Sequence, residues 1–85
     1  VDVETTGIDH ERDAVIQLAL RRFRYDRAGV ITRIDRPYSW LEDPGRSIPP
    51  EITRMTGISD EMVRGQEIDV GAVERMLRNS AVVIA

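Results

Sequence analysis

The chain opens with the sequence VDVETTGI, residues 1–8, in which two acidic side chains alternate with valines before a Thr-Thr-Gly break. Side chains at positions i and i+2 of a β-strand point to the same face. The carboxylates of Asp2 and Glu4 are therefore expected to leave one face of a buried strand just before the backbone turns. A divalent cation relieves their mutual repulsion, because Mg²⁺ and Mn²⁺ prefer carboxylate oxygen. The alternative is a solvated strand end that carries two acids.

Composition limits the chain to one small domain. It has 85 residues, no cysteine and no apolar run near the roughly 20 residues that cross a bilayer. We therefore expect no disulfide, no thiolate metal site and no membrane association, and the reducing cytoplasm as location. The net charge of −3 argues against a binder held mainly by a basic surface. It leaves open an enzyme that reaches phosphates through bound cations.

Both ends of the sequence have the character of buried strands. The chain starts at Val1 inside the acidic strand and stops in the apolar run VVIA, residues 82–85. Continuous apolar runs are typical of central strands, whereas natural termini are usually polar. The interpretation is that residues 1–85 form the N-terminal half of one longer domain.

Hydrophobic patterning predicts strands first and helices later. Residues 14–25 and 30–35 are expected to form a hairpin about a turn at residues 26–29, and Pro37 limits any continuation to an edge or a bend. Short helices are predicted over residues 51–55, ended by Gly57, and after a Ser59 cap.

The last third of the chain is expected to return to the sheet. A final helix over residues 70–77 follows an Asp69 cap, and a strand over residues 81–85 closes the order. This order predicts an α/β fold with a mixed sheet, in which three antiparallel strands are followed by a helical crossover to a parallel strand beside the first.

Two sequence motifs, and the spacing between them, resemble those of the DnaQ-like (DEDD) 3′–5′ exonucleases. This family includes the proofreading epsilon-type subunits of bacterial DNA polymerase III. The first is DVETTGI, residues 2–8, and the second is MTGISDEMV, residues 55–63, preceded by IPPEI at residues 48–52. The strand over residues 15–20 and the later helix and strand follow in the family's order. The resemblance covers the whole chain and implies a truncated ribonuclease H-like fold.

The resemblance implies metal-dependent hydrolysis of phosphodiester bonds at a 3′ end, with release of nucleoside monophosphates. Two Mg²⁺ or Mn²⁺ ions are expected in the intact domain. Asp2 would bridge both metals and Glu4 would bind one, which makes them the catalytic and metal-binding residues. Gly7 would allow close approach of the backbone to the substrate. Contact with the terminal nucleotide is implied for seven residues, Thr5, Thr6, Gly7, Ile8, Thr56, Gly57 and Ile58.

The resemblance implies that the chain binds the single-stranded 3′ end of a nucleic acid, DNA in preference to RNA. It also implies a DNA polymerase subunit as a second partner. The family also needs a second motif, His-Asn-x-x-Phe-Asp, which is expected directly after Ala85. A third motif, further along the chain, supplies either a histidine or a tyrosine and so decides the subclass. The histidine subclass (DEDDh) is favoured. His10 lies in the wrong segment to replace the catalytic histidine. The 85 residues alone are therefore expected to be inactive.

Two other functions stay open at this point. One is a non-catalytic module of the same fold that binds a polymerase or nucleic acid. The other is a phosphatase with Asp2 as nucleophile, which Glu4 and the second motif disfavour. Arginines at positions 21, 22, 24 and 27 fit a solvated strand edge better than a nucleic-acid contact. Tyr38 and Trp40 fit packing better than base stacking.

Overall fold

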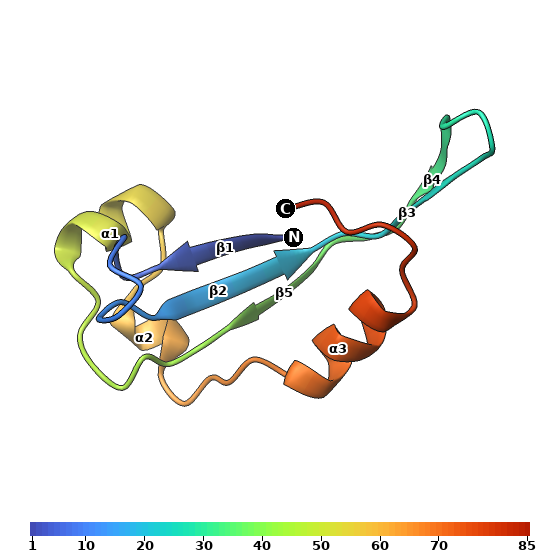
Figure 1. The fold of residues 1–85 in the computed structure, drawn as a ribbon. Coiled ribbons are helices and arrows are strands. Elements are labelled where there is room, and N and C mark those ends of the chain that lie inside the picture. Colours follow the sequence, from blue (N-terminus) through green and yellow to red (C-terminus); the bar gives the residue numbers. More distant parts are fainter.

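The acidic strand at the start of the chain forms one edge of a three-stranded antiparallel sheet in the computed structural model, which describes residues 1–85 (Figure 1). The sheet order is β1-β2-β5, and a separate two-stranded ribbon contains β3 and β4. The predicted α/β class is confirmed, and strands precede helices along the chain as expected. The elements are β1 (Asp2–Thr5), β2 (Val15–Leu20), β3 (Phe23–Tyr25), β4 (Ile31–Ile34), β5 (Tyr38–Leu41), α1 (Pro50–Thr56), α2 (Asp60–Val63) and α3 (Val70–Arg78).

The predicted hairpin is present, but it is broken into two parts. β2 pairs with β5 up to Leu20 opposite Tyr38, and continuing that register would bring Arg21 opposite Pro37. Proline has no N–H to donate to a ladder, so the pairing stops there. The prediction of one continuous strand over residues 14–25 is therefore wrong, because the strand is interrupted between Leu20 and Phe23. The prediction of an edge or a bend at Pro37 is confirmed, because β5 is an edge strand and the chain bends before it.

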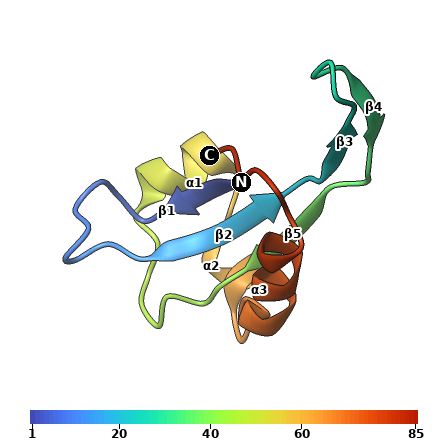
Figure 2. The same cartoon turned by 45° about the vertical axis from the view of Figure 1, so that its right-hand side comes forward.

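Beyond the break, β3 and β4 pair as a ribbon with Phe23 opposite Ile34. Figure 1 and Figure 2 both show this ribbon projecting from the end of the sheet, away from α1 and α2. Gly29 closes its turn with a φ of 82°, a left-handed conformation that glycine adopts without strain.

The core lies between β2 and the short helices. Ile16 is fully buried and clusters with Ile48, Ile58 and Val63, each at most 4% exposed. The capping signals predicted from sequence are confirmed. Ser59 Oγ accepts from the amide of Met62 at 3.3 Å, and three further features agree with prediction: the left-handed Gly57 after α1, the Asp69 cap of α3 and the stacked pair Tyr38–Trp40.

The parallel strand predicted over residues 81–85 is wrong. This segment has no regular secondary structure, and Val82, Val83 and Ile84 are 51–62% exposed. It does return beside the first strand, because the Val1 ammonium group donates to the Ile84 carbonyl at 2.8 Å. One such link is not a ladder, so the observed sheets are wholly antiparallel.

Candidate metal and nucleotide site

Asp2 and Glu4 present their carboxylates on the same face of the sheet. In β1 they stand opposite Ala19 and Gln17 of β2, and directly opposed residues of an antiparallel pair share a face. The core residue Ile16 is on the other face by strand alternation. Asp2 is exposed and Glu4 is half-buried, so this arrangement leaves both carboxylates accessible from one side.

Neither carboxylate is engaged within the chain. The backbone of β1 pairs with β2, but the side chains of Asp2 and Glu4 form no hydrogen bond and no ion pair with any other residue. Their oxygens are the donors that Mg²⁺ and Mn²⁺ prefer, so the donor chemistry fits such an ion. The chain holds no group of three or more His, Cys, Asp or Glu side chains arranged for a metal. These 85 residues therefore contribute two metal donors at most at this site.

The turn after β1 is fixed by a hydrogen-bond network around the buried Thr6 side chain. Thr6 is only 4% exposed, and its hydroxyl donates to Asp13 Oδ1 at 2.9 Å while accepting from the Ala14 amide at 2.9 Å. The other Asp13 oxygen accepts from the Asp9 amide at 2.9 Å. These donors, the Asp9 amide first and then the Thr6 hydroxyl, lower the pKa of Asp13 below its usual value. The network gives Thr6 a structural role, and its contact with a nucleotide stays a prediction.

The structure gives Gly7 a further reason to lack a side chain, and its predicted closeness to the substrate stays a prediction. A Cβ at this position would come within 2.4 Å of Asp13 Oδ2. The glycine therefore makes room for the Asp13 carboxylate, which holds the turn. Ile8 follows at the surface with a fully exposed side chain. An exposed apolar side chain just after the acidic strand is available to a ligand.

The second motif follows α1. In Figure 1 and Figure 2, α1 lies next to β1 at the end of the sheet distant from the ribbon. The Thr56 hydroxyl donates to the Ile52 carbonyl and accepts from the Ile58 amide, and Gly57 is exposed. Ile58 is 2% exposed and belongs to the core, so we assign no nucleotide contact to its side chain. Substrate binding by this segment stays a prediction.

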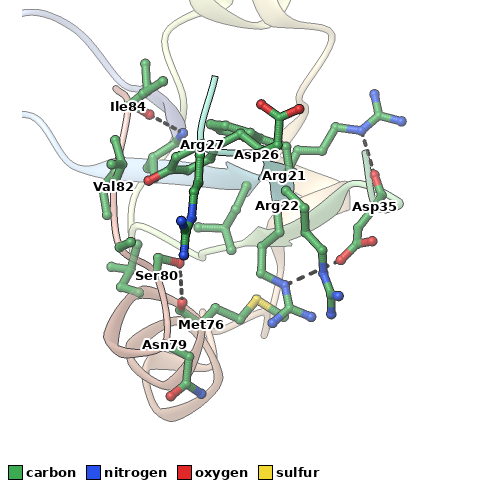
Figure 3. A pocket seen from close by; sticks show the side chains of 18 residues that line it. Arg21, Arg22, Asp26, Arg27, Asp35, Met76, Asn79, Ser80, Val82 and Ile84 are labelled. Carbon is green, nitrogen blue, oxygen red and sulfur yellow. Dashed lines mark hydrogen bonds and ion pairs between the residues drawn. The ribbon is translucent and has the colours of Figure 1, made fainter. Parts of the chain in front are cut away.

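The larger of the two main cavities lies elsewhere. It has a volume of about 650 Å³ and is bounded by the β2–β3 junction, the end of α3 and residues 79–84. Figure 3 shows Arg27 directed into it toward Ser80, and Val82 and Ile84 along its wall. Neither Asp2 nor Glu4 lines it, so this cavity is separate from the carboxylate pair.

Sequence reasoning missed Asp13, which it assigned only to a polar loop. Its one sequence signal is position, since it ends the loop just before a strand, where an acceptor for free backbone amides is useful.

His10 is exposed and makes no contact with the carboxylate pair. None of the three helices has the length and apolar character needed to cross a membrane.

The turn geometry, the paired carboxylates and the second motif together describe a nuclease-type domain. A family profile described as Exonuclease (RNase T) matches residues 1–84, so the chain belongs to this exonuclease family. The predicted membership of the DnaQ-like exonucleases and the ribonuclease H-like α/β class are thereby confirmed.

Particular relatives extend this assignment. The chain is 39% identical over 62 residues to a DNA polymerase III subunit epsilon of Treponema pallidum and 41% identical over 66 residues to that of Aquifex aeolicus. These matches cover 73% and 78% of the chain but 26% and 30% of the two relatives. A DNA polymerase III PolC-type protein of Streptococcus suis is 35% identical over 77 residues, 91% of the chain and 5% of that protein. The chain thus spans less than a third of the relatives it matches.

Proposed function

We propose that residues 1–85 are the first half of a metal-dependent 3′–5′ exonuclease domain of the proofreading type. The substrate is the 3′ end of a DNA strand, and the products are nucleoside monophosphates. The observation that carries the proposal is the pair Asp2 and Glu4, free of internal partners on one face of β1 in a chain of the exonuclease family.

In the intact domain, Asp2 and Glu4 would help to hold two divalent cations, Mg²⁺ or Mn²⁺. When bound, such ions supply water activation and charge stabilisation of the leaving oxygen. The contribution of this chain is to keep two carboxylates at a fixed separation, two residues apart on one strand. The hydrogen-bond network of Thr6 and Asp13 holds the turn that follows.

The terminal nucleotide is bound beside these carboxylates. Thr5, Gly7 and the exposed Ile8 are at the end of the same strand, so they are available to its sugar and base. Gly57, directly after α1, is the exposed residue among Thr56, Gly57 and Ile58 and is therefore the one most open to a nucleotide. A polymerase subunit as partner and a cytoplasmic location belong to the same proposal, supported by the polymerase III subunits among the relatives.

The 85 residues alone are inactive under this proposal. Two carboxylates leave a cation held mostly by water, and such sites bind weakly. The remaining acidic ligands and the general base belong to later motifs of the domain. This accounts for the absence of any cluster of three metal donors in the chain.

The test is hydrolysis of a 5′-labelled single-stranded oligonucleotide by the intact domain in Mg²⁺ or Mn²⁺. Wild type should shorten it one nucleotide at a time from the 3′ end, and chelation should stop the reaction. Asp2→Asn and Glu4→Gln should each remove activity, whereas Glu67→Gln, an exposed acid in a connector, should not. Activity that survives both site variants contradicts the proposal. Hydrolysis by the purified 85-residue chain contradicts its inactivity.

A domain that binds DNA or a polymerase but never hydrolyses DNA, with any metal, is the non-catalytic module instead. Trapping of an aspartyl-phosphate on Asp2 would identify the phosphatase. Both results are incompatible with the proposed exonuclease, so one set of proteins separates the three functions.

A further inference from the structure

The positive charge of this acidic chain is gathered in one projecting element. Residues 21–36 contain six arginines and two aspartates, a net charge of +4, whereas the remaining residues contain six arginines and thirteen acidic residues, a net charge of −7. Residues 21–36 include the ribbon of β3 and β4, which stands away from the sheet in both views (Figure 1, Figure 2). We call this segment the basic ribbon.

Strand register brings three of the six arginines of the basic ribbon onto one face. Arg24 stands directly opposite Arg33, and the Asp35 amide donates to the Arg22 carbonyl at 2.9 Å, which continues the pairing. By strand alternation Arg22, Arg24 and Arg33 share a face. Asp35 is the only acid paired with them, at 3.9 Å from Arg22 and 3.0 Å from Arg33. Arg24 has no ion-pair partner, so this face keeps an excess of positive charge.

The opposite face of the basic ribbon is apolar. Phe23 stands opposite Ile34, and Tyr25 opposite Ile31, with the Phe23 and Tyr25 rings 6.1 Å apart. Arg22, Arg24 and Arg33 are thus segregated from these apolar side chains. Charged side chains on an edge strand can serve to prevent pairing with the strand of another molecule. That purpose does not require two arginines to stand directly opposite each other on the paired strands.

Like charges directly opposed on paired strands destabilise a sheet. Phosphate groups between the two guanidinium groups convert this repulsion into attraction, and the planar guanidinium fork matches a phosphate in bidentate geometry. We propose that the arginine face of the basic ribbon binds the phosphate backbone of the DNA strand whose 3′ end reaches Asp2 and Glu4. The contact reads no sequence, since phosphates carry none.

The length of the molecule allows one DNA strand to contact both the basic ribbon and the acidic pair Asp2 and Glu4. The chain measures 46 Å along its longest axis. At a rise of about 3.4 Å per nucleotide, a strand between the acidic pair and the basic ribbon covers at most about 14 nucleotides. The acidic remainder of the chain repels the strand everywhere else unless cations are bound, so the ribbon orients it.

The test is DNA binding without hydrolysis. Fluorescence anisotropy of a labelled single-stranded oligonucleotide is measured in EDTA over about 50–200 mM salt. Each single-strand phosphate contact contributes roughly 0.7 to the salt slope, so Arg24→Gln with Arg33→Gln should reduce it by about 1.4. Between those salt concentrations wild type should then lose about sevenfold more affinity than the variant.

Two matched variants serve as controls. Arg64→Gln with Arg75→Gln removes the same charge from exposed positions of the helical part and should leave the slope unchanged. Arg24→Lys with Arg33→Lys keeps the charge and should keep most of the slope. Equal effects of the two glutamine pairs, or an unchanged slope for the ribbon pair, overturn the inference.

The inference rests on the proposed function only in taking a DNA strand as substrate, and the two fail separately. If the intact domain hydrolyses DNA while the ribbon variants bind as wild type does, the ribbon inference is wrong and the exonuclease stands. If no metal supports hydrolysis but the ribbon variants lose salt-dependent binding, the exonuclease is wrong and the ribbon inference stands. Wild type that shows no salt-dependent DNA binding overturns the ribbon inference in either case.

Discussion

Thr6 and Asp13 are joined side chain to side chain across the loop that follows the acidic strand, with Thr6 Oγ1 donating to Asp13 Oδ1 at 2.9 Å. This bond closes a loop whose two ends are also tied by the backbone bond from the Thr6 amide to the Ala14 carbonyl. It links the end of β1 to the start of β2. The orientation of the residues that follow Glu4 therefore depends on a network that contains neither carboxylate of the proposed metal site.

Thr6→Val should destabilise the fold by about 1–3 kcal/mol, because it keeps the shape of this buried side chain but removes its hydrogen bonds to Asp13 and the Ala14 amide. Urea unfolding of the variant beside wild type measures the loss. Thr6→Ser keeps the hydroxyl and should recover most of the stability. A loss in Thr6→Ser with none in Thr6→Val would contradict the prediction and assign the effect to the methyl group.

Gly7→Ala should displace the loop, because the added Cβ would lie 2.4 Å from Asp13 Oδ2. We expect a lower melting temperature and changed amide chemical shifts over residues 6–14. The loss should shrink when Asp13→Ala is also present, since the obstructing carboxylate is then gone. Additive losses would contradict the proposed clash.

Gly71→Ala is the matched control, because the added Cβ would meet only ordinary contacts of 3.4 Å or more within α3. Replacing glycine by alanine in a helix interior stabilises by about 0.8–1 kcal/mol, and the gain should be smaller for Gly71 in the first turn of α3. The two alanine substitutions should therefore shift the melting temperature in opposite directions.

Stability should decrease in acid through Asp13 and Asp43. Amide and hydroxyl donors lower the pKa of Asp13, with the Asp9 amide contributing most, and the amides of Gly65 and Gly45 lower the pKa of Asp43. A lowered folded-state pKa means that folding favours the carboxylate. This stabilisation is complete above the unfolded pKa of about 3.9 and is lost as pH falls through the lowered values.

The measurement is the free energy of unfolding between about pH 6 and about pH 2 for wild type, Asp13→Asn and Asp43→Asn. Each variant should lose stability near neutral pH and show a shallower decline in acid than wild type. Glu61→Gln, at an exposed position in the first turn of α2, should decline as wild type does. An unchanged acid slope in both aspartate variants would contradict the prediction.

Asp2→Asn and Glu4→Gln should leave stability within about 0.5 kcal/mol of wild type, because neither carboxylate has an internal partner. Removing one of two like charges on the same face can raise stability slightly. Thermal melts without divalent cations test this. A loss above about 2 kcal/mol would indicate a structural role for the carboxylates.

The sequence by itself determined which acids belong to the candidate site, because alternation along a strand is a local property of the backbone. It also determined the helix caps at Ser59 and Asp69, since a cap needs only its own next turn. The break at Pro37 follows in the same way from a missing amide hydrogen. Local chemistry of this kind is written into a few consecutive residues.

Only the tertiary structure decided what depends on distant partners. The role of Gly7 could not be read locally, because the carboxylate it accommodates comes from Asp13 across the loop. The opposed Arg24 and Arg33 required a register that one residue of slip would destroy. The apolar residues 82–85 lacked a ladder partner beyond the link at Val1, so hydrophobicity alone did not make them a strand. Strand pairing is a relation between segments, and its outcome is set by where those segments meet.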